Sequence, residues 1–282
     1  MNKPLETVWE LVKVFTKKPT YVTIDDISIE SFVNDLSKVT LEKIEPPSCA
    51  KDNWQLIRFE LIANSVNYCY WYGSHNIRPN NAGAVSMYNN LVQSCTQNAS
   101  SDVIINNFIN RLSHERFPWM DKRAAYLKEL LKWQFDDTVT EIENNVNDIE
   151  KCLDIIIMQF PGYSNDIFLK RTSLFFMQIA RQSDLFHSQL HLLPVPADYQ
   201  IPKMLEHMGI LRYNVELKQM IENEDLIPSG SRIECEIRAS TIEACRRLCE
   251  KSGKDPSTVD FWLWLNRKSC SNKFHLTITT DY

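Results

Sequence analysis

The chain has 282 residues, of which 44% are hydrophobic and only six are glycine, and its formal net charge is −5. This length and composition allow a sizeable buried core in one large domain or two small ones, and the scarcity of glycine favours helices over loops. The acidic balance argues against a non-specific DNA-binding protein, which needs a basic face, and leaves room for a small anionic ligand held by a few cations.

The N-terminal part of the chain predicts two helices followed by a buried segment. Residues 5–16 place apolar side chains at helical spacing, and a second helix is expected to start at Asp25 or Asp26. Residues 54–72 are apolar almost throughout, which predicts a buried element. The turn-rich stretch 73–83 ends it.

Helical patterns dominate from residue 84 onward. Residues 120–133 form an amphipathic pattern, and residues 138–159 place their apolar side chains on one face of what reads as a single helix. Asp166 is expected to begin the next helix. Residues 193–197 (LPVPA) form a rigid approach to a further helix that has Pro202 in its first turn, where the missing N–H costs little.

The C-terminal part predicts two short strands around two helices. Residues 232–239 (RIECEIRA) alternate as a strand does. Ser240 begins a capping-box pattern for a helix that Gly253 should end, and Asp255 with Pro256 should begin the last helix. The tail 274–282 is expected to be a strand. We therefore predict a mainly α-helical fold with a few short strands, and a single globular domain over residues 1–282.

The same sequence indicates a reduced, cytoplasmic protein. Its eight cysteines are scattered without a CxxC pair, as is typical of reduced thiols. We expect no signal peptide and no membrane helix, because no apolar run approaches the roughly 18 residues that a membrane span needs. His187 and His191 are four residues apart, but Ser188 stands where zinc proteases have Glu, and no third ligand is evident.

Four segments resemble the queuosine salvage family in their order and separation. They are NYCYW (67–71), FPGYSNDIFLKR (160–171), ADYQIPKMLEHMGILRY (197–213) and IPSGSRIECEIRASTIEA (227–244). The resemblance covers roughly residues 20–282, with weaker support from segments 117–127, 259–265 and 274–282. It implies a helical fold related to the helix-hairpin-helix DNA glycosylases. It also implies hydrolysis of queuosine 5′-monophosphate to queuine and ribose 5-phosphate, for queuine salvage in tRNA modification, without a metal or organic cofactor.

Such a reaction requires a negative charge beside the sugar. Cleavage of the C1′–N9 bond builds positive charge on the ribose, which an ionised carboxylate stabilises. Queuine is a 7-deazapurine and lacks N7, the usual protonation site, so that carboxylate and hydrogen bonds to the base edge must contribute more. Asp198 precedes a predicted helix, whose positive end favours negative charge. A helix cap is the simpler interpretation of Asp198, but the resemblance favours the catalytic role, and the two are compatible.

The 5′-phosphate requires a cation, and three residues are candidates. Lys170 and Arg171 are neighbours in a predicted helix, and Lys203 lies one turn into the helix after Asp198. Adjacent helical residues point about 100° apart, so only one of the first two should reach the ligand. Without the resemblance, this pair is typical of a solvated helix face.

Candidates for binding the base and sugar fall into two groups. Asn67, Tyr68 and Trp71 lie in an apolar run, where the amide can read the base edge and a ring can stack on it, although an aromatic core is the simpler interpretation. The second group is nearer the C-terminus. Glu236 and Arg238 would share one face of the predicted strand, where the carboxylate could bind the ammonium or the hydroxyls of queuine. Arg238 could instead pair with Glu236 as a structural bridge or be a further candidate for the phosphate. Asp260 and His275 are weaker candidates, His275 as a proton donor.

Two other functions remain open from the sequence. The first is a glycosylase that acts directly on DNA or RNA, which must flip a base and grip a backbone. The second is a non-catalytic helical interaction module. The acidic charge favours a free nucleotide as the partner, with no stable nucleic-acid complex and no membrane.

Overall fold

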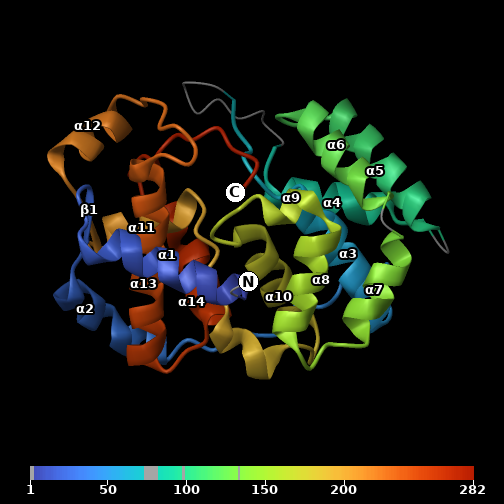
Figure 1. The fold of residues 1–282 in the computed structure, drawn as a ribbon, viewed down its shortest axis with the longest axis horizontal. Helices are drawn as coiled ribbons and strands as arrows, with labels where there is room; N and C mark the ends of the chain where they lie inside the picture. Colours follow the sequence, from blue (N-terminus) through green and yellow to red (C-terminus); the bar gives the residue numbers. More distant parts are fainter. Residues whose placement is uncertain (1–2, 73–81, 97–98, 133) are drawn as a thin grey trace.

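The computed structural model describes residues 3–72, 82–96, 99–132 and 134–282, and its elements are mainly helical, as predicted (Figure 1). Most of the turn-rich stretch at 73–83 lies outside these residues. In chain order the elements are α1 (Pro4–Lys17), β1 (Val22–Ile24), α2 (Asp26–Ser37), α3 (Asn53–Ser65), α4 (Ala84–Ser94), α5 (Ser101–His114), α6 (Met120–Leu130), α7 (Phe135–Glu143), α8 (Ile149–Gln159), α9 (Pro161–Ser164), α10 (Lys170–Gln182), η2 (His187–Leu192), α11 (Gln200–His207), β2 (Leu211–Tyr213), α12 (Val215–Glu222), α13 (Arg232–Ser252), α14 (Pro256–Asn266) and η3 (Arg267–Ser269).

Several helix ends follow from local capping chemistry. Asp25 caps α2 by accepting a hydrogen bond from the backbone N–H of Ser28, which confirms the predicted start. Asp255 caps α14 and Pro256 is its first residue, as expected. Gly253 ends α13 with a φ of 70°, a left-handed conformation that favours glycine.

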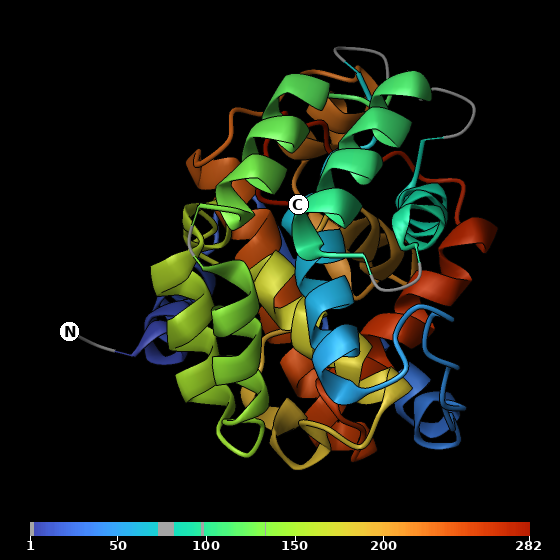
Figure 2. The same ribbon diagram turned by 90° about the vertical axis from the view of Figure 1, so that its right-hand side faces the viewer.

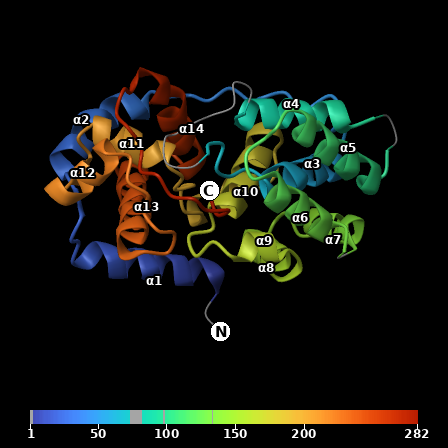
Figure 3. The same cartoon turned by 90° about the horizontal axis from the view of Figure 1, so that it is seen from above.

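The helices form two groups with α10 between them (Figures 1 and 3). The first group holds α1, α2 and α11 to α14, and the second holds α3 to α9. Each group surrounds an apolar cluster, and α13 contributes Ala239 and Ile242 to one cluster and Ala244 and Leu248 to the other. The C-terminal end of the chain lies between the groups. The long helix α13 therefore links the two apolar clusters.

Helix α3 is the centre of the second group. It packs against α4, α6, α7 and α10 (Figure 2). Its side chains are buried from Phe59 to Ser65 without a break, so the buried element expected at 54–72 is confirmed as α3 followed by a non-helical segment at 66–72. Burial on every side explains why this helix shows no amphipathic stripe in the sequence.

A small antiparallel sheet ties the N-terminal part to the first group. Strand β1 pairs with β2, with Val22 opposite Tyr213 and Ile24 opposite Leu211. The fully buried carboxylate of Glu236, on α13, accepts hydrogen bonds from the backbone N–H groups of Thr20, Tyr21 and Val22. A single acidic side chain thus fixes the start of this sheet.

The strand predicted at 232–239 is wrong, because these residues form the first turns of the 21-residue helix α13. Ser231 caps this helix, and Ser240 lies in its interior rather than at a start. The alternation in the sequence does not mark exposure, since Glu234, Glu236 and Arg238 are as buried as the apolar residues between them. Because these polar side chains have partners inside the fold, they are buried where a helical pattern would have apolar residues, and the sequence does not show the helix.

Three further boundaries differ from the prediction. The helix expected at 138–159 is two helices, α7 and α8, because Asp148 starts a new one by capping the N–H of Lys151. Asp166 does not begin α10 but accepts the N–H groups of Phe168 and Lys170 in the turn before it. The tail is not a strand: it forms one isolated bridge, between Leu276 and Leu226. Across the described ranges, no helix combines the length and apolarity needed to span a bilayer.

Candidate functional site

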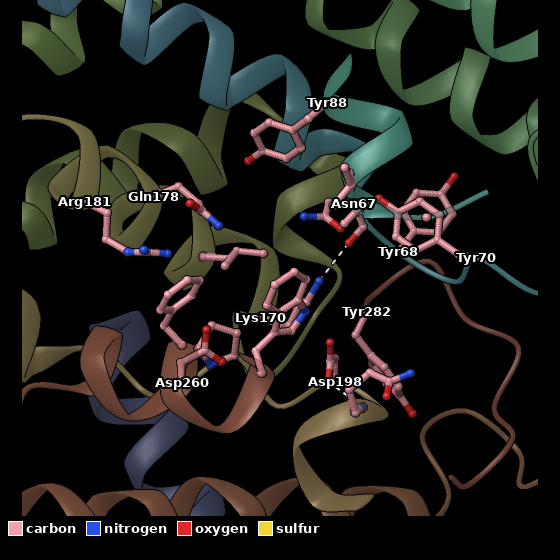
Figure 4. A pocket seen from close by; sticks show the side chains of 18 of the residues that line it. Asn67, Tyr68, Tyr70, Tyr88, Lys170, Gln178, Arg181, Asp198, Asp260 and Tyr282 are labelled. Atoms are coloured by element: carbon pink, nitrogen blue, oxygen red, sulfur yellow. Dashed lines mark hydrogen bonds between the residues drawn. The ribbon is translucent and has the colours of Figure 1, made fainter. Parts of the chain in front are cut away.

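A cavity of about 550 Å³ opens between the two groups of helices (Figure 4). Its size is within the range of small-molecule sites. The walls come from α4, α10 and α14, from the segment after α3, from the turn before α11 and from Tyr282. Five of the predicted site residues line it, namely Asn67, Tyr68, Lys170, Asp198 and Asp260.

Asp198 lies at the start of α11 and faces this cavity. Its Oδ1 accepts hydrogen bonds from the backbone N–H groups of Gln200 (2.7 Å) and Ile201 (3.1 Å). Its own N–H donates to the carbonyl oxygen of Pro196 at 2.9 Å, which holds the turn in place. Capping uses Oδ1, so Oδ2 remains for the cavity. The positive end of the helix stabilises negative charge at this position.

Lys170 and Asp260 form a charged cluster with Asp198. The Lys170 ammonium donates to the carbonyl oxygen of Asn67 at 2.9 Å. Burial lowers the pKa of Lys170 to about 8, and the charge of Asp198 opposes this shift. Burial also raises the pKa of Asp260 to about 8, and Asp198 adds to that shift by repulsion. Near neutral pH the site therefore holds a carboxylic acid at Asp260 beside a protonated lysine.

The cavity wall formed by α14 carries two stacked aromatic rings, and two arginines that the sequence analysis missed, Arg181 of α10 and Arg267 of η3, lie against them. The rings of Phe261 and Trp264 are 6.1 Å apart and nearly parallel. The guanidinium of Arg181 lies 3.4 Å from the centre of the Phe261 ring, and that of Arg267 lies 3.4 Å from the centre of the Trp264 ring. Helical spacing from Lys170 through Leu174 and Gln178 to Arg181 could have indicated the first of these arginines.

The segment after α3 supplies the polar face of another wall. Tyr70 donates its hydroxyl to Oδ1 of Asn67 at 2.9 Å, and both line the cavity. The Tyr68 hydroxyl is buried and has no hydrogen-bond partner among the described residues, which leaves it for a ligand. Trp71 does not line the cavity. Its ring is fully buried and packs against Phe274, so its predicted role in stacking on the base is not supported.

Buried cations hold this non-helical segment in place from behind. Arg123 donates to the carbonyl oxygens of Val66, Tyr68 (2.6 Å) and Cys69 (2.8 Å). Arg171 donates to the carbonyl oxygens of Ser65 and Gly162, and its guanidinium lies among three tyrosine rings. Arg171 is therefore used by the fold and does not line the cavity, contrary to its predicted role at the phosphate. The sequence could not show this, because Ser65 is 106 residues away and Gly162, nine residues away, lies in a separate helix.

Lys203 also lies apart from the cavity lining. Its ammonium donates to the carbonyl oxygen of Cys270 at 3.5 Å, which places it between α11 and the segment after α14. Its predicted contact with the phosphate is not supported by this position.

Glu236, Arg238 and His275 are likewise absent from the cavity lining and have structural contacts. Glu236 holds the start of β1, as described above. Arg238 forms buried ion pairs with Asp166 (2.8 Å) and Glu234 (3.5 Å). Burial lowers the pKa of His275 to about 3, and its Nε2 lies 3.1 Å from the hydroxyl of Tyr282, so its predicted role as a proton donor is not supported by this position.

In the part of the chain that the structure describes, no three His, Cys, Asp or Glu side chains come together in a group that could hold a metal ion. The polar groups of the cavity are instead three carboxyl side chains (Glu45, Asp198 and Asp260), a lysine, two arginines, hydroxyls and amides. This set suits an organic anion with hydrogen-bonding groups.

Comparison with known proteins gives the site its context. The family described as queuosine salvage protein matches residues 47–280. A protein of Sphaerobacter thermophilus named queuosine 5′-phosphate N-glycosylase/hydrolase is 26% identical, with 79% of this chain and 81% of that protein covered. A protein of the same name from Dictyostelium discoideum is 24% identical, with 80% and 78% covered. A mouse protein of that name is 22% identical over about half of each chain. The chain therefore belongs to the queuosine salvage protein family.

Proposed function

We propose that this protein hydrolyses the N-glycosidic bond of queuosine 5′-monophosphate and releases queuine and ribose 5-phosphate. The observation that carries the proposal is the carboxylate of Asp198, held by two backbone N–H groups at a helix start and facing a cavity of nucleotide size. The names of the relatives from Sphaerobacter and Dictyostelium support the same substrate.

In this proposal the residues around Asp198 have separate roles in the reaction. The C1′–N9 bond breaks, its electron pair leaves with the base, and Asp198 stabilises the positive charge that develops at C1′. A water molecule supplies the hydroxyl group that C1′ gains, and a proton goes to the departing base. Asp260, which keeps its proton near neutral pH, is the candidate donor, and the proton that the water loses restores it. Lys170 lies between the two acids and holds the Asn67 wall.

We assign the phosphate to Arg181 and Arg267. The cations of the described cavity lining are these two arginines and Lys170. Lys170 lies near two acidic side chains, so its charge is compensated within the protein. Arg181 has a buried Nε without a hydrogen-bond partner among the described residues, whereas Arg267 donates from Nη1 to the carbonyl oxygen of Trp264 and would use its other N–H groups. A guanidinium stacked on an aromatic ring is well oriented to hold a phosphate through paired N–H groups.

We also propose a related fold, a free nucleotide as substrate and the cytoplasm as the compartment. An acidic side chain at a helix start is also the arrangement in helix-hairpin-helix DNA glycosylases, and we propose that the fold is related to theirs. The enclosed cavity and the acidic net charge favour a free nucleotide over a duplex or an RNA chain. The free state of all eight cysteines supports action in the cytoplasm.

The test is the variant Asp198→Asn, incubated with queuosine 5′-monophosphate while free queuine is measured by mass spectrometry. The amide keeps the size of the side chain and can still accept the capping hydrogen bonds, so the fold should persist. Release of queuine should fall by at least about a thousandfold, because a neutral group no longer stabilises the transition state. A folded Asp198→Asn protein with wild-type turnover would refute the mechanism.

A further inference from the structure

A buried carboxylate stands behind the cavity wall without lining it. Glu60 on α3 has no exposed surface, and its carboxylate accepts three hydrogen bonds. The donors are the hydroxyl of Tyr88 (2.6 Å), the side-chain amide of Gln182 (2.7 Å) and that of Asn64 (3.0 Å). Tyr88 and Gln182 come from α4 and α10 and line the cavity, so one acid joins three helices at this wall.

The hydrogen bonds continue from Glu60 along the wall. Asn67 donates from Nδ2 to Oδ1 of Asn64 at 3.3 Å, and Asn67 in turn accepts from Tyr70 and from Lys170. Figure 4 shows Tyr88 at the top of the cavity and Asp198 at the bottom, with Lys170 between them. Glu60 is thus one end of a chain of contacts that reaches the residue beside Asp198.

Glu60 determines which polar atoms the wall presents. Tyr88 has one hydroxyl proton, and that proton is directed to Glu60. Gln182 has two amide protons, which go to Glu60 and to the carbonyl oxygen of Gln178 at 3.0 Å. The Tyr88 oxygen also accepts from Nδ2 of Asn64 at 3.4 Å, which leaves it one further lone pair. What remains for the cavity is this lone pair of Tyr88 and the amide oxygen of Gln182, both hydrogen-bond acceptors.

This arrangement is costly for folding, which suggests a role beyond packing. Burial raises the pKa of Glu60 to about 7, against the effect of its three donors. A buried carboxylate contributes less to stability than apolar residues of similar volume, since its desolvation offsets much of what its hydrogen bonds provide. Its polar contacts do, however, fix the orientation of side chains that a ligand meets.

We propose that Glu60 is a positioning residue that makes the wall of Tyr88 and Gln182 an acceptor surface for the N1–H and 2-amino donors of a guanine-like base. The identity of the base rests on the proposed function, since the core of queuine is 7-deazaguanine. A base without the 2-amino group leaves one acceptor of the wall without a hydrogen-bond donor. Because an unpaired buried polar group costs free energy, the site should bind such a base more weakly.

The test compares the binding of two free bases, 7-deazaguanine and 7-deazahypoxanthine, which differ by the 2-amino group. Titration calorimetry with the wild-type protein should give a Kd about tenfold or more lower for 7-deazaguanine. Tyr88 and Gln182 donate to different oxygens of Glu60, and in Glu60→Gln an N–H₂ group replaces one of these oxygens. The side chain that donated to it must then turn. The preference for 7-deazaguanine should then fall by about tenfold.

The matched control is Glu236→Gln, the same substitution at an equally buried glutamate away from the cavity. It should lower the melting temperature and leave the ratio of the two Kd values unchanged. If Glu60→Gln does not fold, Tyr88→Phe removes one acceptor while Glu60 stays, and it should also reduce the ratio. An unchanged ratio in a folded Glu60→Gln or in Tyr88→Phe overturns the proposal, as does a wild-type protein that binds both bases equally.

These measurements are separate from the proposed function, because they involve no turnover. If 7-deazaguanine is preferred through Glu60 but queuosine 5′-monophosphate is not cleaved, the proposed hydrolysis fails and this inference stands. If cleavage proceeds and the preference is independent of Glu60, the inference fails and the hydrolysis stands.

Discussion

At the scale of single residues, the chemistry depends on how four titratable side chains share one cavity. Asp198, Lys170, Asp260 and Arg181 influence one another electrostatically, and burial moves the pKa values of the lysine and of Asp260 toward each other, to about 8. A group that keeps its proton next to one that carries a negative charge is the arrangement that acid–base catalysis requires.

Asp260→Asn tests the protonation state of Asp260 through stability. The pKa of an aspartate is about 3.9 in an unfolded chain and about 8 in this fold. The contribution of Asp260 to the free energy of unfolding is therefore fully present below about pH 4. It is lost as the pH rises toward 8, because the unfolded chain releases the proton more readily than the folded one. Denaturant unfolding should show Asp260→Asn gaining stability relative to wild type between pH 4 and pH 8. A difference that stays constant over this range would contradict the assignment.

Arg181→Ala tests the assignment of the phosphate. Loss of a charged hydrogen bond of about 1.5–3 kcal/mol should lower kcat/KM for queuosine 5′-monophosphate by about tenfold to a hundredfold. The effect on the nucleoside queuosine, which has no phosphate, should be small. Lys268→Ala, at an exposed position outside the cavity lining, serves as the control. Equal losses on nucleotide and nucleoside would place the phosphate elsewhere.

The sequence could identify Asp198 and Lys170 but not the uses of their neighbours. A predicted helix start and a family motif were enough to place an acid at Asp198. Arg171 is adjacent to Lys170, and only the packing of α10 against α3 shows that its guanidinium serves carbonyl oxygens. Glu60 gave no signal, because a glutamate within an apolar run shows its partners only once α4 and α10 are in place.

At the scale of elements, α13 shows how buried polar residues mislead a sequence pattern. Helix starts with an acidic or hydroxyl cap and a glycine end were predicted well, since these signals are local. The alternating residues 232–239 were not, because the partners of Glu236 and Arg238 are distant in the chain: Glu236 accepts from the backbone at the start of β1, and Arg238 pairs with Asp166 as well as with Glu234 one turn away. The helical character of this segment depends on contacts that lie about 70 to 200 residues away.

Glu236→Ala tests the link between α13 and the N-terminal sheet. Three backbone N–H groups lose their acceptor, and at least one of them is buried, so we expect a loss of about 3 kcal/mol in the free energy of unfolding. Urea unfolding measures this loss. Glu250→Ala, on the exposed part of the same helix, should change stability by less than about 1 kcal/mol. Similar effects of the two changes would mean that the sheet does not depend on Glu236.

At the scale of the whole molecule, the cavity lies where two apolar clusters meet, and α13 belongs to both. Unfolding of one group would strip α13 of part of its packing and expose the other. We therefore predict that residues 1–282 unfold as one domain, with a single transition that coincides by circular dichroism and by tryptophan fluorescence. Two separate transitions would show that the groups are independent domains.

The cations behind the segment at 66–72 affect the thermodynamics of recognition as well as the fold. Arg123 and Lys170 hold its carbonyl oxygens, so the conformational entropy of this wall is lost when the chain folds rather than when a ligand arrives. A nucleotide then binds to a wall that is already ordered. The heat capacity change on binding should therefore reflect the buried contact area, without a contribution from ordering of this segment. A substitution at Arg123, which does not line the cavity but holds Tyr68 and Cys69 that do, would move that entropy loss into the recognition step and weaken affinity without removing a ligand contact.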